Sequence, residues 1–225
     1  MSKFAFGKLI DISAAAAILI ALYFAFIFAP VEAKMGAIQK IFYFHVASAW
    51  VGFFALFVTF IASILFLKKR DSASDYVAAA SAEIGLLFCT IVIITGPLWA
   101  KPVWGAYWSW DPRLTTTLVL WFIYAGYILL RKFVAETERR RLYCAVLGII
   151  GFVDVPIVFF SIRWWRTIHP NVLQKGGGGL HPHMLTALLV SVAAFTILYA
   201  ALMNKRIRLF KLEARYAQDN DETNG

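Results

Sequence analysis

Charged residues and cysteines are scarce in this sequence. Only 16% of its 225 residues are charged, whereas 61% are hydrophobic, a balance that is rare in soluble domains of this size. The two cysteines, Cys89 and Cys144, lie far apart and form neither a Cys-x-x-Cys nor a Cys-x-x-Cys-His motif. These absences exclude a dithiol oxidoreductase and a covalent c-type cytochrome. Two buried free thiols are the simplest interpretation.

Long apolar runs account for the excess of hydrophobic residues. A transmembrane helix needs about 20 mostly apolar residues. Six stretches meet this requirement, at residues 9–29, 41–67, 76–96, 113–131, 142–161 and 183–203. We therefore predict an all-α integral membrane protein with six transmembrane helices, in which residues 1–225 form a single polytopic membrane domain. The first stretch is not followed by a small-residue cleavage site, so we expect it to be retained.

The distribution of basic residues orients the predicted helices. The net charge is +9, and most of the 22 Lys and Arg residues fall in segments on the same side as the N-terminus, notably 131–141 and 205–215. The positive-inside rule then places both termini in the cytoplasm, an N-in/C-in topology. Residues 213–225 are polar, and we expect them to form a flexible cytoplasmic tail. This distribution argues for membrane lipid, and against nucleic acid, as a partner.

The segment at 97–112 links the third and fourth predicted helices on the outer side. With this topology, residues 30–40 and 162–182 are also outside. The middle segment ends in Trp104-Gly-Ala-Tyr-Trp-Ser-Trp-Asp111, which is too aromatic for an ordinary loop and too polar to cross a bilayer. We interpret it as a shallow aromatic platform at the membrane surface that could hold a flat, largely apolar ligand.

Tryptophans also have a purely structural interpretation. They gather at membrane interfaces whether or not they bind a ligand. This preference could account for Trp99, Trp164 or Trp165 taken singly, but it fits the dense outer cluster poorly. If that segment is helical, Trp104 and Trp108 lie on one face of the helix, which also carries Asp111, while Trp110 points elsewhere.

Gly105 and Asp111 mark the two ends of the aromatic cluster. Gly105 lacks a side chain where a ligand or a neighbouring backbone could come close. Asp111 precedes Pro112, and Asp at the N-cap followed by Pro at the first helical position is a common helix start. We therefore expect Asp111 to cap the helix that begins near Arg113.

All four histidines fall at or next to the outer face. His45 lies about one turn into the second apolar stretch, and the small residues Ser48 and Ala49 leave space beside its imidazole. His169 follows the Trp- and Arg-rich segment 163–166. An ionisable residue near a bilayer is a candidate functional residue, although His45 could simply bond to an outer-loop carbonyl.

The remaining polar residues of interest have simpler explanations. His181 and His183 flank Pro182 and could bind a transition metal weakly, but solvated histidines at a helix start are the simpler interpretation. Glu83 and Asp154 lie within apolar stretches, and no spacing pairs them. We therefore predict no proton relay.

Two outer imidazoles, an indole platform and nearby cations together suit haem. Histidine is a common axial ligand of haem iron, and tryptophans can pack against the macrocycle. Four cations could pair with the propionates: Lys101, Arg113, Arg163 and Arg166. The site would be shallow, which suits passing haem on.

Other functions remain open at this point. A transmembrane haem exporter or transporter would need polar residues or broken helices along a midplane path, and neither is evident in the sequence. A b-type membrane electron-transfer cytochrome would hold haem between helices, yet no histidine lies deep in a predicted span. A structural scaffold would use its tryptophans only as lipid anchors.

The aromatic segment resembles the WGxxWxWD signature of the WWD-domain haem-handling proteins. The six-span size, the flanking Lys101-Pro-Val and Pro112-Arg-Leu-Thr, Tyr43-Phe-His45 and Trp164-Trp-Arg-Thr-Ile-His169 are similar to the CcmC family of cytochrome c maturation system I. The resemblance covers nearly the whole chain. It implies a multi-pass protein of the bacterial cell inner membrane, with its functional face in the periplasm.

The resemblance also implies a ligand, partners and a site. Haem b (iron protoporphyrin IX) would be bound transiently, with His45 and His169 as axial ligands, and presented to the periplasmic haem chaperone CcmE during c-type cytochrome biogenesis. The chain would be a haem-transfer component rather than a conventional enzyme, in a membrane complex with CcmA, CcmB and CcmD. The other expected haem-binding residues are Trp99, Trp104, Gly105, Trp108, Trp110, Asp111, Arg113, Trp164, Trp165 and Arg166.

Overall fold

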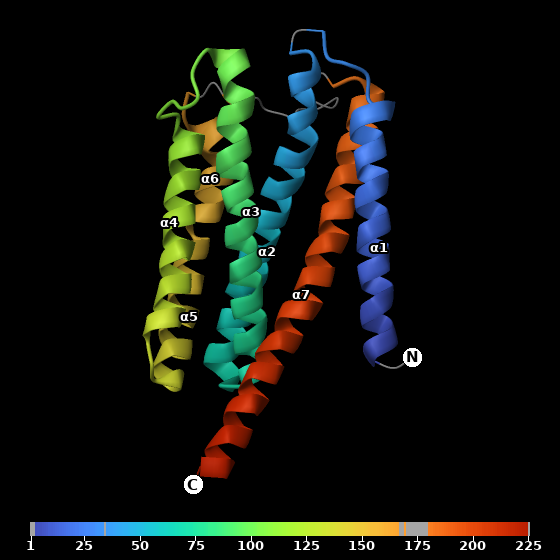
Figure 1. Ribbon diagram of the computed structural model, residues 1–225. Coiled ribbons are helices and arrows are strands. Elements are labelled where there is room, and N and C mark those ends of the chain that lie inside the picture. The colour runs from blue at the N-terminus through green and yellow to red at the C-terminus, as the bar shows by residue number, and fades with distance from the viewer. Residues whose placement is uncertain (1–2, 34, 167–168, 170–179, 225) are drawn as a thin grey trace.

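A computed structural model describes residues 3–33, 35–166, 169 and 180–224 of the chain. Most of these residues lie in helices (Figure 1). The helices are α1 (Lys3–Tyr23), α2 (Ile41–Lys69), α3 (Ser72–Trp104), α4 (Pro112–Phe133), α5 (Thr137–Phe152), α6 (Asp154–Trp164) and α7 (Pro182–Asn224), with short π and 3-10 turns η1 (Phe24–Phe28) and η2 (Ala37–Lys40). The described residues contain no strand, only an isolated bridge between Glu32 and Gly36.

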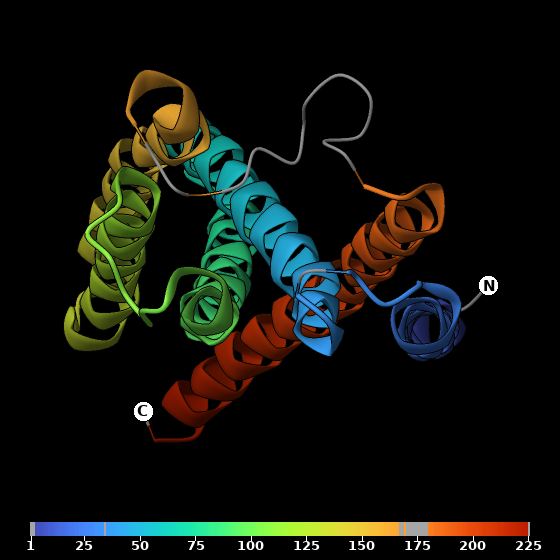
Figure 2. The ribbon, with the colours of Figure 1, turned by 90° about the horizontal axis from the view of Figure 1, so that it is seen from above.

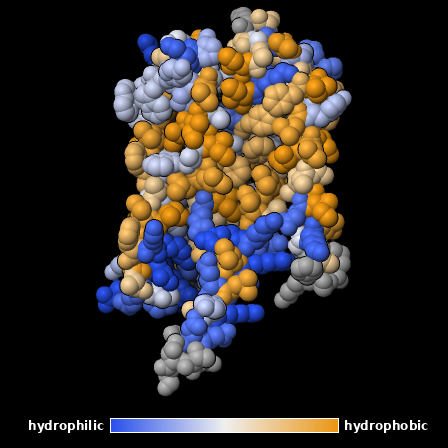
Figure 3. Space-filling view, viewed as in Figure 1, coloured by the Kyte–Doolittle hydropathy of each residue, from blue (hydrophilic) through white to orange (hydrophobic). Residues whose placement is uncertain are grey.

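Six helical rods in the described residues are long and apolar enough to cross a membrane, which confirms the predicted fold class. Figure 3 shows the apolar side chains as a broad band between two hydrophilic ends. In Figure 1, α1 begins and α7 finishes at the same end of the bundle. We call it the basic end, because it carries the segments 131–141 and 205–215. The opposite end, with the α3–α4 loop, is the tryptophan end.

Helices α2 and α3 are the most closely packed pair in the bundle. Arg70, at φ 55°, makes the tight turn between them, and Asp71 caps α3 by accepting a 2.8 Å hydrogen bond from the amide of Ser74. This bond holds the pKa of Asp71 below its ordinary value. At Gly85 an added Cβ would lie 2.7 Å from Leu56, so the close approach needs a residue without a side chain.

The other helices lie on two sides of this central pair, as the view along the bundle shows (Figure 2). On one side, α7 contacts α2 and α3, and α1 packs mainly on α7. On the other side, α4 packs on α3, α5 and α6, while α5 also reaches α2. Cys89 and Cys144 are buried free thiols, as expected.

The fifth predicted span is interrupted near its middle. Helix α5 ends at Phe152 and α6 begins at Asp154. Pro156 has no N–H to donate to the carbonyl of Phe152, so the regular helical ladder cannot continue there. One carboxylate oxygen of Asp154 is buried without a hydrogen-bond partner among the described residues.

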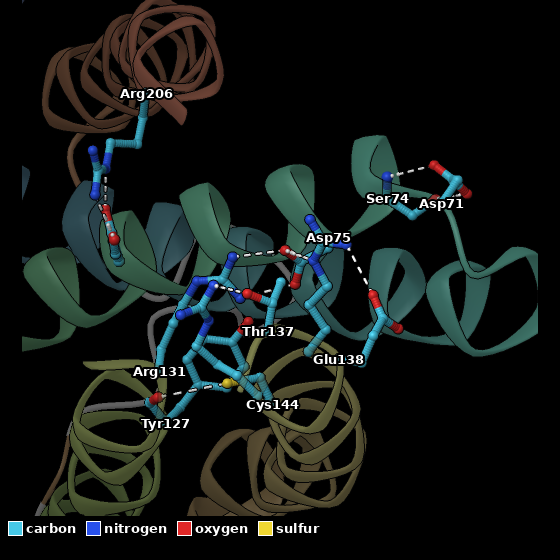
Figure 4. Close-up of polar contacts among 12 residues, drawn as sticks. Asp71, Ser74, Asp75, Tyr127, Arg131, Thr137, Glu138, Cys144 and Arg206 are labelled. Carbon is cyan, nitrogen blue, oxygen red and sulfur yellow. Dashed lines mark hydrogen bonds and ion pairs between the residues drawn. The ribbon is translucent and has the colours of Figure 1, made fainter. Parts of the chain in front are cut away.

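Ion pairs join the helices at the basic end, as Figure 4 shows. Asp75 on α3 is buried and accepts two hydrogen bonds from Arg131 of α4, at 2.8 and 2.7 Å. Arg141 of α5 lies 3.3 Å from the same carboxylate. One acid therefore joins three helices.

Glu83 is paired, which corrects the expectation that this acid stands alone. Its carboxylate accepts hydrogen bonds from Arg206 of α7, one of them at 2.8 Å from Nη2. The guanidinium carbon of Arg206 also lies 4.1 Å from the centre of the Phe210 ring. The two partners are 123 positions apart in sequence, so only the packing of α3 against α7 brings them together.

Two segments that the sequence placed outside the transmembrane spans are largely helical. Residues 97–104, assigned to the outer loop 97–112, continue α3 through Pro97 and Pro102, so the loop spans only 105–111. Residues 213–224, expected to be a flexible tail, continue α7. Strong helix formers such as Leu212, Glu213 and Ala214 favour that continuation. Arg206 adds an ion pair with Glu213, two turns further on, at 3.5 Å.

Candidate functional site

Gly105 ends α3 at the tryptophan end and begins the loop to α4. Its φ of 77° is left-handed, and its amide donates to the carbonyl of Lys101 at 2.9 Å, a common helix C-cap. An added Cβ would have no neighbour within 4 Å. The left-handed backbone therefore favours glycine at this position, and no described residue lies close to where a side chain would be. The loop is not helical, so Trp104, Trp108 and Asp111 do not share a helix face.

His45 is buried between α2 and α3. Its Nδ1 lies 2.9 Å from the hydroxyl of Thr95, and a Cβ added at Gly96 would lie 3.4 Å from its Cε1. Its imidazole is stacked on the indole of Trp99, with ring centres 6.5 Å apart at an interplanar angle of 28°. The structure therefore fixes this imidazole through α3 rather than through an outer-loop carbonyl.

Four rings form a continuous row at the tryptophan end, which we call the ring row: His45, Trp99, Trp104 and His169. Successive ring centres are 6.5, 6.0 and 6.3 Å apart. Trp99 is buried, whereas Trp104 and His169 are half-buried. The ring row links two histidines that are distant in sequence through the indoles of Trp99 and Trp104 at the end of α3.

Arg113 and Asp111 lie beside the ring row at the start of α4. Asp111 accepts a 3.0 Å hydrogen bond from the amide of Arg113, and Pro112 occupies the first helical position, which confirms the predicted cap. Both Arg113 and His169 are within electrostatic range of His45. Arg113 is half-buried and thus suited to pairing with an acidic ligand group.

The other aromatic residues that were predicted to bind haem do not belong to the ring row. No described ring contact joins them to it. Trp108 and Trp110 pack against each other at 5.8 Å, and Trp110 is 76% exposed. Trp164 and Trp165 are exposed neighbours at the end of α6. Arg166 is exposed as well.

Two further cations that were expected to meet propionates are engaged with protein groups. Lys101 donates to the carbonyl of Gly105 at 2.8 Å and lies 5.2 Å from the centre of the Tyr107 ring. The guanidinium carbon of Arg163 lies 5.8 Å from the centre of the Phe160 ring. Of the expected cations, Arg113 is within electrostatic range of His45.

His181 and His183 stand at the start of α7. The amide of His183 donates to Nδ1 of His181 at 3.3 Å, and the ring of His183 packs on Phe28 at 4.8 Å. Among the described residues, no group of three or more His, Cys, Asp or Glu side chains could hold a metal ion. The hydrogen bond from the amide of His183 to His181 fits the helix-start interpretation of these two histidines.

Sequence reasoning missed Thr95 and Gly96, which contact His45 from α3. Both are uncharged residues inside an apolar stretch, and they lie 50 and 51 positions after His45. A threonine in a helix commonly satisfies its own hydroxyl on the preceding turn. No local pattern therefore distinguishes these two from other small residues in the spans.

The chain is similar to known proteins over almost its full length. A family model described as Heme exporter protein C matches residues 3–221. Heme exporter protein C of Bradyrhizobium diazoefficiens is 40% identical over 176 residues, covering 77% of this chain and 67% of that protein. Heme exporter protein C of Escherichia coli K12 is 34% identical, covering 80% and 74%. A putative cytochrome c biosynthesis ccmC-like mitochondrial protein of Marchantia polymorpha is also 34% identical, covering 79% and 76%.

Proposed function

Because the chain belongs to the heme exporter protein C family, we propose that it binds haem at its tryptophan end and presents it for cytochrome c biogenesis. The ring row is the observation that carries this proposal. It gathers two imidazoles and two indoles from separate parts of the chain. Histidine is a common axial ligand of haem iron. His45 and His169 are the proposed axial ligands.

Polar groups at the tryptophan end are suited to the two propionates of haem. Trp99 Nε1, Ser109 Oγ and Thr115 Oγ1 are buried without a hydrogen-bond partner among the described residues. Buried polar atoms are almost always hydrogen-bonded, and these three can all donate to a carboxylate. Arg113 can add a bidentate, charge-assisted pair. These groups, together with the indoles, form a donor set suited to an amphipathic macrocycle.

Each part of the site has a separate role in this proposal. His45 and His169 hold the iron and so fix the plane of the macrocycle. Trp99 and Trp104 cover apolar surface and exclude water. The half-buried Trp108 and the exposed Trp110, Trp164 and Trp165 contact the part of haem that projects beyond the ring row. Gly105, Asp111 and Arg166 are proposed to line the same part of the site.

The proposed acceptor is the periplasmic haem chaperone CcmE. When bound, haem b supplies the vinyl group to which a chaperone histidine becomes attached. The chain contributes orientation and proximity, because it holds that edge within reach of the acceptor. Binding is transient, so the protein acts as a haem-transfer component rather than as a conventional enzyme.

We further propose an N-in/C-in topology in the bacterial inner membrane, with the tryptophan end in the periplasm. The support is the number of Arg and Lys residues in the segments 131–141 and 205–215 at the basic end. Figure 3 shows hydrophilic side chains at that end, next to the apolar band. The proposed membrane partners are CcmA, CcmB and CcmD, and the surrounding lipid contacts the apolar band.

Absorption spectra of the purified protein test the proposal. Hemin titrated into the wild-type protein should give the spectrum of iron with two histidine ligands. His45→Ala or His169→Ala should weaken binding and change that spectrum, because each removes one ligand. His181→Ala and His183→Ala are matched controls and should leave it unchanged. Loss of binding in His181→Ala alone would show that the proposed ligand pair is wrong.

Two further assays separate this function from its rivals. Addition of CcmE to the haem-loaded protein should move haem to the chaperone, and the His45→Ala variant should not support this transfer. Movement of haem across a liposome membrane without chaperone would favour a transporter instead. Rapid reversible reduction by quinol would favour an electron-transfer cytochrome.

A further inference from the structure

The hydroxyl of Thr95 lies between a carbonyl and an imidazole. Its oxygen is 2.7 Å from the carbonyl oxygen of Ile91, one turn earlier on α3, and 2.9 Å from Nδ1 of His45 on α2. A hydroxyl has a single proton to donate. The carbonyl can only accept, so the proton of Thr95 is directed to Ile91. The hydroxyl oxygen is then left to accept a proton from His45.

This arrangement determines which ring nitrogen of His45 carries the proton. In a neutral imidazole one nitrogen is a donor and the other an acceptor, and the hydrogen bond made by one sets the role of the other. Since Nδ1 must donate to Thr95, Nε2 holds the lone pair. Only a nitrogen with a lone pair can bind iron.

The ring is also held in place on two further sides. A Cβ added at Gly96 would come within 3.4 Å of Cε1, so that edge of the imidazole lies directly against α3. Trp99, one turn after Thr95, stacks on the ring. With Nδ1 bonded and Cε1 packed against α3, rotation of the ring would break the bond to Thr95.

We propose that Thr95 is a positioning residue that makes His45 an Nε2 ligand, by accepting the Nδ1 proton while its own proton is held by the carbonyl of Ile91. The proposal rests on the proposed function only in taking haem iron as the ligand. The tautomer is a property of the haem-free protein and can be measured separately.

Thr90 offers a matched control on the same helix. Its hydroxyl also donates to the carbonyl four residues earlier, Leu86, at 2.8 Å, and accepts a ring N–H from another helix, that of Trp121, at 2.8 Å. Thr90→Val and Thr95→Val therefore remove the same group from the same kind of contact. The two contacts differ in the ring that faces the hydroxyl. At Thr95 it belongs to His45, a candidate iron ligand, whereas at Thr90 it belongs to Trp121.

Solid-state NMR of ¹⁵N-histidine-labelled protein in liposomes measures the tautomer without haem. The signal of His45 is assigned by its loss in His45→Ala. In the wild type, Thr95→Ser and Thr90→Val, we expect a protonated Nδ1 and an unprotonated Nε2. In Thr95→Val, where no acceptor faces Nδ1, we expect the proton to move at least partly to Nε2.

Hemin titration then tests the consequence for ligand binding. Loss of a hydrogen bond that orients a metal-bound histidine typically weakens metal binding by about 10–100-fold. We expect that loss in Thr95→Val, near-wild-type affinity in Thr95→Ser, and no change in Thr90→Val. Rescue by serine separates loss of the hydroxyl from a general loss of packing.

The outcomes distinguish the two proposals. A protonated Nδ1 that persists in Thr95→Val, or hemin affinity in that variant equal to that of Thr90→Val, would overturn the role of Thr95 while leaving the haem function intact. The expected tautomers in a wild-type protein that binds no hemin would support the assignment of Thr95 and overturn the haem function.

Discussion

Single polar residues in the apolar interior have well-defined partners at the basic end. Asp75 is the clearest case, because its carboxylate is 3% exposed and faces two arginines from different helices. Replacing one member of a buried ion pair leaves the other charge without compensation, and this costs far more than losing an exposed pair. The stable packing of the three helices that meet at Asp75 should therefore depend on this carboxylate.

Asp75→Asn should lower the free energy of unfolding by about 3–5 kcal/mol, because Arg131 and Arg141 lose their counter-charge. Denaturant unfolding in detergent micelles, followed by circular dichroism, measures this change. The control is Glu136→Gln, which removes an exposed pair with Arg139 and should cost no more than about 1 kcal/mol. Equal effects of the two substitutions would contradict a special role for the buried pair.

The cap made by Asp111 was predicted correctly from local sequence, whereas the contact of Thr95 with His45 between two helices was not predicted. Asp111 followed by Pro112 is a local signal of a helix start, and the structure confirms it. Gly105 was noted for its missing side chain, but its left-handed backbone is what requires glycine. Thr95 had no local signal, because its partner on α2 is 50 positions away.

At the scale of elements, the packing of α2 on α3 determines the site. His45 lies near the start of α2 and Thr95 near the end of α3, so these antiparallel helices must be in correct register for the two to meet. Gly85 permits this register near the centre of the pair. Its absent Cβ would lie 2.7 Å from Leu56 and 3.3 Å from Ala55.

Gly85→Ala should destabilise the protein by about 1–3 kcal/mol, because the added methyl group overpacks the α2–α3 contact. It should also weaken the binding of hemin, since the two helices would shift apart. Gly126→Ala on α4 is the control, because its added Cβ would have no neighbour within 4 Å. That change should be neutral or stabilising by up to about 1 kcal/mol. Unfolding and hemin titration of both variants provide the comparison.

At the scale of the whole molecule, the two ends of the bundle differ in chemistry. Basic residues and ion pairs gather at one end, and the ring row lies at the other. This polarity supports the proposed N-in/C-in orientation. It also separates the proposed haem site from the buried ion pairs of Asp75 at the basic end.

Single cysteines introduced at the two ends should react from opposite sides of the membrane. Tyr107 on the α3–α4 loop is 58% exposed and Tyr216 on α7 is 71% exposed. In intact spheroplasts, a membrane-impermeant maleimide should label Tyr107→Cys, and Tyr216→Cys only after permeabilisation. The wild-type protein is the control, because Cys89 and Cys144 are buried and should stay unlabelled. The reverse pattern would invert the topology.

The amino-acid sequence by itself determined the number of spans, the all-α class and the family, because long apolar runs and a dense tryptophan motif are local patterns that need no tertiary contact. It could not predict the pairing of Glu83 with Arg206, which are 123 positions apart. That pairing depends on which charged side chain a neighbouring helix presents to the buried acid. The ring row was likewise decided by tertiary structure, since only the packing of α2 against α3 turns His45 toward Thr95 and Trp99.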